Sequence, residues 1–411
     1  MFKNYLLSID SSSIYIYSET ILQSIISIFL IISGFFFVRK ISFFLKNDVN
    51  RVSIIYIYHL FFSILFFYYS FVSPSDSKGF YTKGIRDNFD ITTMNFLGSE
   101  FIKIIVHYLY TLFNFSYFSC FIFFGLLGCV GLIAIDSVIQ NLSNKKTLIN
   151  NQIGKLFIFF PSLHFWSSSL GKESLIIFSI GILFWSFYFF SKKNLILIFF
   201  SFLIIFIIRP YFGFAIFISF YLSYIVFADK NLKYIFLNIS FMFLIILFIP
   251  ITYNFLVITD QQPITYLNVL SNIISPNIDS IYSILYEYIS SKQNLFIDSN
   301  TSVSLSDKSL FIKIFFFLFM PNIFSFENLF ILFVGIENFI LLIAIIFLLN
   351  NIKIKTLSNF YNFFIFLFIF IIIILLALVT SNLGLANRQK WMIIPILFIF
   401  LLSCQYKQKL K

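Results

Sequence analysis

The sequence predicts an all-α, polytopic integral membrane protein, a helical bundle of about eleven transmembrane helices with re-entrant or interfacial helices on its outer face. Of the 411 residues, 60% are hydrophobic and only 11% are charged. The apolar residues gather in runs long enough to cross a bilayer, and short basic clusters separate the runs. We therefore expect a single transmembrane domain over residues 1–411, with outer loops at about 73–115 and 258–310.

The net charge of +11 does not indicate nucleic-acid binding, because the basic residues lie in linkers between apolar runs and not on one binding face. Their distribution places the N-terminus outside and the C-terminus in the cytoplasm. Cys120, Cys129 and Cys404 lie in or beside apolar runs, where cysteine behaves as a small buried hydrophobe. No Cys and His spacing typical of a metal site occurs, so we expect no bound metal and no cofactor.

The expected spans are the apolar runs themselves. In chain order they are 21–38, 53–72, 117–135, 156–166, 174–190, 195–208, 212–227, 234–256, 329–349, 361–379 and 392–402. Each compact basic linker, such as the one from Arg39 to Arg51, then lies on the cytoplasmic side. Run 156–166 is short for a crossing and contains Pro161, so we expect a broken helix that packs against protein or a cavity.

Three further patterns describe the packing around these spans. Residues 101–113 are apolar on one side and carry Lys103 and His107 on another, which predicts an amphipathic helix in the interface. Run 311–326 is interrupted by Pro321, so we expect a re-entrant or interfacial segment. Close helix packing is expected on one face of run 117–135, at Gly125, Gly128 and Gly131.

Basic residues on the expected outer side depart from the positive-inside pattern, and they are the candidate substrate-binding groups: Lys172, Arg209, Arg388 and Lys390. Arg209 ends a span and either snorkels to the interface or presents its guanidinium fork to a phosphate. Arg388 and Lys390 lie in what we expect to be a second polar turn, where Asn387 could bond hydroxyl groups of a ligand.

Other candidates surround the segment SSSLGKES. Lys172 opposes the dipole of the following helix, which favours a ligand role, whereas Glu173 and Ser174 are placed to stabilise that helix start. His164 has a suitable pKa for a catalytic base, although a histidine between aromatic residues is often structural. Glu337 lies within an apolar run and is expected to face the bundle interior.

Carboxylates in the first outer loop are the remaining catalytic candidates. Asp87 and Asp90, with Glu100 nearby, could do acid–base work, or they could be ordinary solvated loop residues. One or two carboxylates are also enough for Mg²⁺. No zinc-protease, P-loop or nucleophile-elbow motif accompanies them.

The blocks PSLHFWSSSLGKE, IIRPYFG and GLANRQKWMIIP, with Arg209 and Arg388 inside the last two, carry a resemblance. The chain resembles the Wzy-type polymerases of O-antigen and oligosaccharide repeat units, which are multispanning enzymes of bacterial surface-polysaccharide assembly. The resemblance implies polymerisation of repeat units at the outer face of the inner membrane. The implied partners are a polyprenyl-diphosphate-linked oligosaccharide, membrane lipids and a chain-length regulator.

The resemblance also implies roles for residues. Arg209, Arg388 and Lys172 would hold the donor diphosphate while a base activates an acceptor hydroxyl, so positioning and charge neutralisation would carry catalysis. Two alternatives stay open. A GT-C-type glycosyltransferase using a polyprenyl-phosphate sugar would depend on Asp87, Asp90 and Glu100, and a lipid-oligosaccharide flippase or other transporter would need paired charges in mid-membrane.

Overall fold

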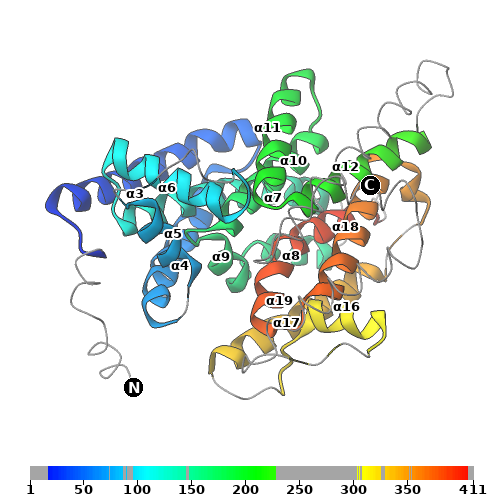
Figure 1. The fold of residues 1–411 in the computed structure, drawn as a ribbon. Helices are drawn as coiled ribbons and strands as arrows, with labels where there is room; N and C mark the ends of the chain where they lie inside the picture. The colour runs from blue at the N-terminus through cyan, green and yellow to red at the C-terminus, as the bar shows by residue number, and fades with distance from the viewer. Residues whose placement is uncertain are drawn as a thin grey trace, which may run out of the picture. The chain divides into compact units, whose positions relative to one another are not determined.

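The structure is a computed structural model of the chain. It describes residues 17–73, 75–86, 89, 96–144, 148–227, 303, 305, 308–324, 329–350, 352 and 354–405. The chain divides into two compact units, which are Met1–Arg209 with Lys407–Lys411, and Pro210–Tyr406. In Figure 1 the helices of the first unit are coloured from blue to green and those of the second from green to red.

Six helices within the described residues are long and apolar enough to cross a membrane. They are α3 (Ile21–Leu45), α4 (Val49–Val72), α7 (Tyr117–Ser143), α12 (Pro210–Phe227), α17 (Leu329–Leu349) and α18 (Phe360–Val379). A seventh span results if α19 (Leu383–Lys390) and α20 (Ile394–Ser403), bent by 47°, form one broken crossing. The expectation of a helical integral membrane protein is confirmed.

The count of about eleven spans stays a prediction. α10 (Lys172–Tyr188) and α11 (Leu195–Ile208) follow two of the expected runs but have 17 and 14 residues. Both are shorter than the roughly 20 residues that a helix needs to cross the hydrocarbon core. The expected span 234–256 lies outside the described residues, as does most of the expected outer loop 258–310.

The central helix of the first unit is α7, and its C-terminal end lies beyond the expected one. Run 117–135 was expected to end before a cytoplasmic linker that begins at Asp136, but the helix continues to Ser143. Asp136 is fully buried, and Arg51 donates to its two oxygens at 2.7 and 2.8 Å. A buried carboxylate is tolerated when a partner compensates its charge, so the helix does not have to end there.

The glycines of α7 permit the close packing that the sequence predicted. A Cβ atom built on Gly131 would lie 2.5 Å from the Phe178 Cα of α10, nearer than real Cβ contacts allow. A Cβ on Gly128 would overlap the carbonyl oxygen of Ser167. These two positions let α10 and the segment before it lie directly on the backbone of α7.

The expected break at Pro161 is present. α8 (Leu148–Phe157) ends before it, and Pro161 begins the short helix α9 (Pro161–Ser167). Segment 155–166 follows α4 along most of its length: Arg51 donates to the Lys155 carbonyl at 2.6 Å, and the Phe66 and Phe165 rings lie 4.7 Å apart. The buried serines at the end of α9 and just after it donate to carbonyl groups of α9, which satisfies the polar groups of an irregular segment inside the bundle.

The two ends of the first unit differ, and we name each by one residue. At the Lys46 end, α3 passes into α4. At the Ser70 end, α4 finishes and α7 begins, and the Tyr117 hydroxyl donates to Ser70 at 3.0 Å. The Ser70 end also carries α5 (Asp76–Gly84) and α6 (Ser99–Phe113), which pack against each other. α6 buries Ile102, Val106 and Leu109 as an amphipathic helix would, but Lys103, which we expected on the polar side, is buried with them because it is paired with Glu100.

The second unit is built around α18. Rings of α12 contact it, with Phe220 and Phe364 6.0 Å apart, and α16 (Leu310–Phe319) packs on it as well. α16 ends before Pro321, as the interruption predicted. Residues 383–390, which we expected to be a polar turn, instead form the helix α19, capped by the Asn382 side chain. The asparagine and glycine of this segment are typical of turns, but here they serve a helix start.

Candidate functional site

Arg209 is buried at the C-terminal end of α11. It is the C-cap residue of α11, only 8% exposed, and its Nη2 donates to Glu173 Oε1 at 2.6 Å. Glu173 is 1% exposed and lies in the first turn of α10, where the helix dipole also favours a negative charge. Arg209 is therefore neither snorkelling to an exposed surface nor holding an isolated charge.

A glycine brings α6 to this pair. Gly98 has φ +63°, a conformation that favours glycine, and its N–H donates to the Ile207 carbonyl at 2.8 Å. The next residue, Ser99, accepts a hydrogen bond from Lys172 Nζ at 3.0 Å. Lys172 is thereby held between the start of α10 and the start of α6.

A second ion pair, between Lys103 and Glu100, completes the group on α6. We call the five residues the first-unit charge cluster; it comprises Glu100, Lys103, Lys172, Glu173 and Arg209. The formal charges of these five side chains, three cations and two carboxylates, sum to one positive charge. The cluster could attract a single anionic group at the Ser70 end, but it does not match the charge of a diphosphate.

The start of α10 differs from the expected capping arrangement. Ser174 was placed to cap this helix, but the N-cap residue is Gly171, which has no side chain to accept a hydrogen bond. Ser174 instead donates back to the Gly171 carbonyl at 2.9 Å. The stabilisation of this helix start comes from the Glu173 charge, as expected for that residue.

A lysine on α5 adds to the positive potential of the same end. Lys78 Nζ donates to the Phe71 carbonyl at 3.4 Å and lies 5.3 Å from the centre of the Phe71 ring. Desolvation by burial lowers the pKa of its ammonium group. Lys78 was not among the sequence candidates, because one lysine in a polar loop carries no distinguishing pattern.

His164 lies in a buried pair with His59 of α4. Their Nδ1 atoms are 3.0 Å apart, and His164 Nε2 is 2.7 Å from the Ile158 carbonyl oxygen. A carbonyl only accepts, so His164 carries its proton on Nε2, and in neutral rings His59 is the donor of the shared bond. Both nitrogens of His164 are thus engaged with protein groups, and this geometry ties α9 to α4. A catalytic role for His164 stays a prediction.

The second unit contains a separate polar cluster. Lys390, at the end of α19, is fully buried, and its Nζ donates to Asn338 Oδ1 of α17. Asn338 Nδ2 in turn donates to the Pro321 carbonyl at 2.8 Å. The carboxylate of Glu337 acts electrostatically on Lys390 and is itself 8% exposed, so it faces the interior as expected. We call Glu337, Asn338 and Lys390 the second-unit polar cluster.

The neighbours of Lys390 on α19 are less uniformly buried. Asn387 is 4% exposed, and its Oδ1 has no hydrogen-bond partner among the described residues. Gln389 accepts from the Thr380 hydroxyl at 3.0 Å, while Arg388 is half-buried. The predicted group of Asn387, Arg388 and Lys390 therefore lies together on one short helix. Within it, the buried side-chain oxygen of Asn387 could accept a hydrogen bond from a ligand.

The carboxylate candidates Asp87 and Asp90 lie outside the described residues, and their catalytic role stays a prediction. Glu100, close to them in sequence, is paired with Lys103. Within the residues that the structure describes, no group of three or more His, Cys, Asp or Glu side chains could hold a metal ion.

Sequence reasoning missed the partners of these residues. His59 lies inside an apolar run, and an ionisable residue in that position was an available signal. Ser99 and Asn338 carried no signal, because their roles depend on which helices become neighbours. Comparison of the chain with protein-family models, with curated proteins and with solved structures found no match.

Proposed function

We propose that this protein is an enzyme of bacterial surface-polysaccharide assembly that polymerises lipid-linked oligosaccharide repeat units at the outer face of the inner membrane. The observation that carries the proposal is the fully buried Lys390 on a short polar helix, next to Arg388 and at a 47° bend before the apolar α20. Broken membrane helices place polar groups at depths where an unbroken helix would bury only apolar ones.

In this proposal the donor is a polyprenyl-diphosphate-linked oligosaccharide. Arg388 contacts the diphosphate with its guanidinium fork, and Lys390, whose Nζ is held in place by Asn338, supplies a hydrogen-bond donor beside it. The amide of Asn387 bonds a sugar hydroxyl. An acceptor hydroxyl attacks the anomeric carbon, its proton passes to a base, and the bond to the diphosphate breaks. A chain-length regulator is the expected partner. The acid–base role of Asp87 and Asp90 stays a separate prediction, because these residues belong to the first unit and lie outside the described residues.

The first-unit charge cluster has a supporting role in this scheme. Because Glu173 already compensates Arg209, we assign that pair to positioning α10 and α11, and we assign Lys172 to attracting an anionic group toward the Ser70 end. This differs from the role that the resemblance implies for Arg209, which was direct contact with the diphosphate.

The experiment uses the source strain with the gene deleted and complemented by variants. We expect Arg388→Ala to leave complete lipid-linked single repeat units but no ladder of polymer on a gel, with partial recovery in Arg388→Lys. The double variant Arg209→Gln/Glu173→Gln, which keeps a hydrogen bond without the charges, should retain the ladder. Lys83→Ala, at an exposed position on α5, is the matched control for a lost cation.

A transporter of the same lipid-linked oligosaccharide is the second candidate, because the carboxylate of Glu337, within α17, acts electrostatically on the buried Lys390, so the second unit contains two opposite charges in its interior. Transport predicts that loss of function traps complete repeat units on the cytoplasmic side, where an impermeant oxidant cannot reach them. Repeat units lacking one sugar would instead indicate a glycosyltransferase. An unchanged glycan profile in Arg388→Ala would overturn the enzyme proposal.

A further inference from the structure

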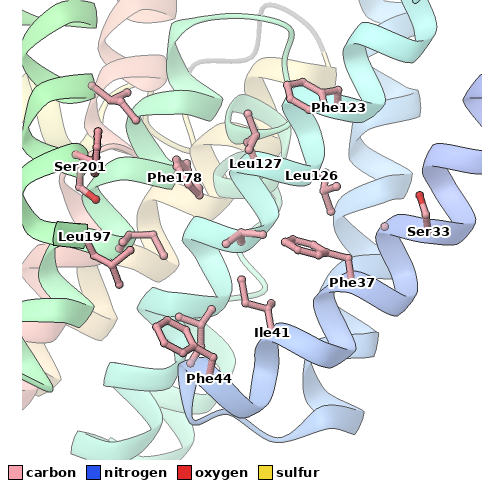
Figure 2. A pocket seen from close by; sticks show the side chains of 16 residues that line it. Ser33, Phe37, Ile41, Phe44, Phe123, Leu126, Leu127, Phe178, Leu197 and Ser201 are labelled. Atoms are coloured by element: carbon pink, nitrogen blue, oxygen red, sulfur yellow. The ribbon is translucent and has the colours of Figure 1, made fainter. Parts of the chain in front are cut away.

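The first unit contains an apolar cavity of about 550 Å³ on its side. It is lined by α3, α7, α10 and α11, and Figure 2 shows α3 on one side and α11 on the other, with side chains of α7 between them. Apart from Ser33, Gly34 and Ser201, every lining residue is a large hydrophobe. We call this cavity the lateral groove.

The lateral groove opens toward the hydrocarbon of the bilayer. Phe37 and Phe44 of α3 and Phe200 of α11, all lining residues, have exposed fractions of 48%, 53% and 55%. Only 22% of the apolar part of α3 is buried inside the protein, the smallest share among the candidate spans. A hydrocarbon chain lying in the groove would cover these rings and join α3 to α11, and the volume is within the range of small-ligand sites.

The end of the groove nearest Lys46 is strongly basic. Lys46 directly follows the lining residue Leu45, is exposed, and has its Nζ 4.3 Å from the centre of the Phe189 ring. Asn194 Nδ2 donates to the Phe189 carbonyl at 2.8 Å, which holds the turn containing Lys192 and Lys193 at the same end. Both of these lysines are exposed, and only Asn194 separates them from the start of α11.

A further lysine lies on the groove side of α3. At 100° per residue, Lys40 shares a helix face with the lining residues Ser33, Phe37 and Phe44. It is exposed and lies less than two turns before the end of α3, so its ammonium group can reach the same interface by snorkelling.

Acidic groups do not cancel this charge. Asp48 caps α4 by accepting from the Arg51 N–H at 2.8 Å. Asp136 is fully buried and bonded by the Arg51 side chain, so its charge is already compensated. Against these, the four lysines around the mouth of the groove leave a clear excess of positive charge.

We propose that the lateral groove binds an anionic phospholipid from the leaflet at the Lys46 end, with an acyl chain along the groove and the phosphate between Lys46 and Lys192. The cations select an anionic headgroup, since each basic residue near a membrane surface contributes about 1 kcal/mol toward anionic lipid. The groove lies on the side of the helices, and its basic mouth is at the end opposite the first-unit charge cluster. The groove is therefore a separate feature from that cluster.

The test uses the full chain purified in detergent and mixed with phosphatidylglycerol and phosphatidylethanolamine in equal amounts. Native mass spectrometry should show one phosphatidylglycerol retained in preference to phosphatidylethanolamine. Lys46→Gln/Lys192→Gln should weaken that retention at least about tenfold, because two favourable charges are lost. Lys83→Gln, which removes an exposed lysine at the Ser70 end, should bind like the wild type.

A second variant separates the groove from its charged mouth. Leu197→Trp places a larger ring in the groove without changing charge, and it should also abolish the retained lipid while the circular dichroism spectrum stays helical. Equal retention of the two lipids by the wild type, or full retention by the double lysine variant, would overturn the proposal. Displacement of phosphatidylglycerol by an equal amount of polyprenyl phosphate would also overturn it and assign the groove to the substrate chain.

Discussion

Arg51–Asp136 and Arg209–Glu173 carry a large part of the electrostatics of the first unit. Both carboxylates are at most 1% exposed, and each pair joins residues that lie on different helices. Removing an ion from water costs several kcal/mol, so each buried charge depends on the presence of its partner. The two pairs fix the lateral positions of the helices at opposite ends of the unit.

The Arg209–Glu173 pair leads to a prediction on stability. Arg209→Met leaves a buried, uncompensated carboxylate, so it should destabilise the protein by about 3–5 kcal/mol. Thermal unfolding in detergent, followed by circular dichroism, measures the effect as a lower midpoint. Arg209→Gln/Glu173→Gln removes both charges and should return the midpoint close to the wild-type value.

If the double variant unfolds at the same midpoint as Arg209→Met, the carboxylate of Glu173 is compensated by groups other than Arg209. Activity provides an independent readout, because the positioning role that we assign to this pair requires the double variant to keep its polymer ladder. Loss of the ladder at normal stability would return Arg209 to direct substrate contact.

Sequence reasoning identified the ionisable residues but not their pairing. Lys172, Glu173, Arg209 and Glu337 stood out as charges beside or within apolar runs, and all four lie in the two clusters. The pairing could not be predicted, because Arg209 and Glu173 are 36 residues apart and meet only through the packing of α10 on α11. Asp136 was missed because it lies at the expected end of a span, where a charge is ordinary.

Glycine contacts determine how tightly the helices of the first unit pack. Gly131 of α7 and Gly181 of α10 face each other, and a Cβ on Gly181 would lie 2.8 Å from the Gly131 Cα. Because backbone atoms are involved, rotation of a side chain cannot relieve such an overlap. The two helices must separate to accommodate a methyl group at either position.

We therefore expect opposite results from two chemically identical substitutions. Gly131→Ala should lower the unfolding midpoint, since overpacking costs roughly 1–3 kcal/mol. Gly79→Ala on α5, where nothing lies within 4 Å of the new Cβ, should be neutral or stabilise the protein by up to about 1 kcal/mol. Thermal unfolding of both variants under one condition tests this, and equal effects would contradict the packing described for α7.

The elements themselves were predictable where apolar runs had clear ends. α11 and α17 begin and end at the expected residues, because polar residues flank both runs. α19 was not predicted as a helix, since its Asn and Gly residues are typical of turns. What stabilises it is tertiary: Lys390 is held by Asn338, and Gln389 is held by Thr380.

The orientation of the whole chain follows from its basic linkers and can be tested by labelling. The native cysteines Cys120, Cys129 and Cys404 are at most 1% exposed, so they provide an unreactive background. Lys83→Cys at the Ser70 end should react with an impermeant maleimide on intact cells. Lys193→Cys at the Lys46 end should react only after the membrane is permeabilised.

Reversed labelling of these two positions would invert the predicted topology and place the first-unit charge cluster in the cytoplasm. Such a result would exclude an outer-face role for the first-unit charge cluster. Labelling of both positions on intact cells would mean that α3, α4 and their neighbours do not separate two compartments, and the wild type must remain unlabelled for either comparison to hold.

For the whole molecule, composition alone predicted that the chain is a membrane protein, but it did not predict how the helices are arranged. A strong bias toward Phe and Ile makes every span look alike, so apolar pattern alone does not select neighbours for each helix. Which helices become neighbours is determined by a few polar and small residues, such as Arg51 with Asp136 and Gly131 with Gly181.

The separation in sequence of the buried ion pairs has a consequence for biogenesis. During synthesis at about 5–20 residues per second, Asp136 emerges about 4–17 s after Arg51, which precedes it by 85 residues. Arg209 follows Glu173 by 36 residues and therefore emerges about 2–7 s after it. Until then each early charge must stay near the membrane interface or the insertion machinery, so the order of translation sets the order in which the helices settle together.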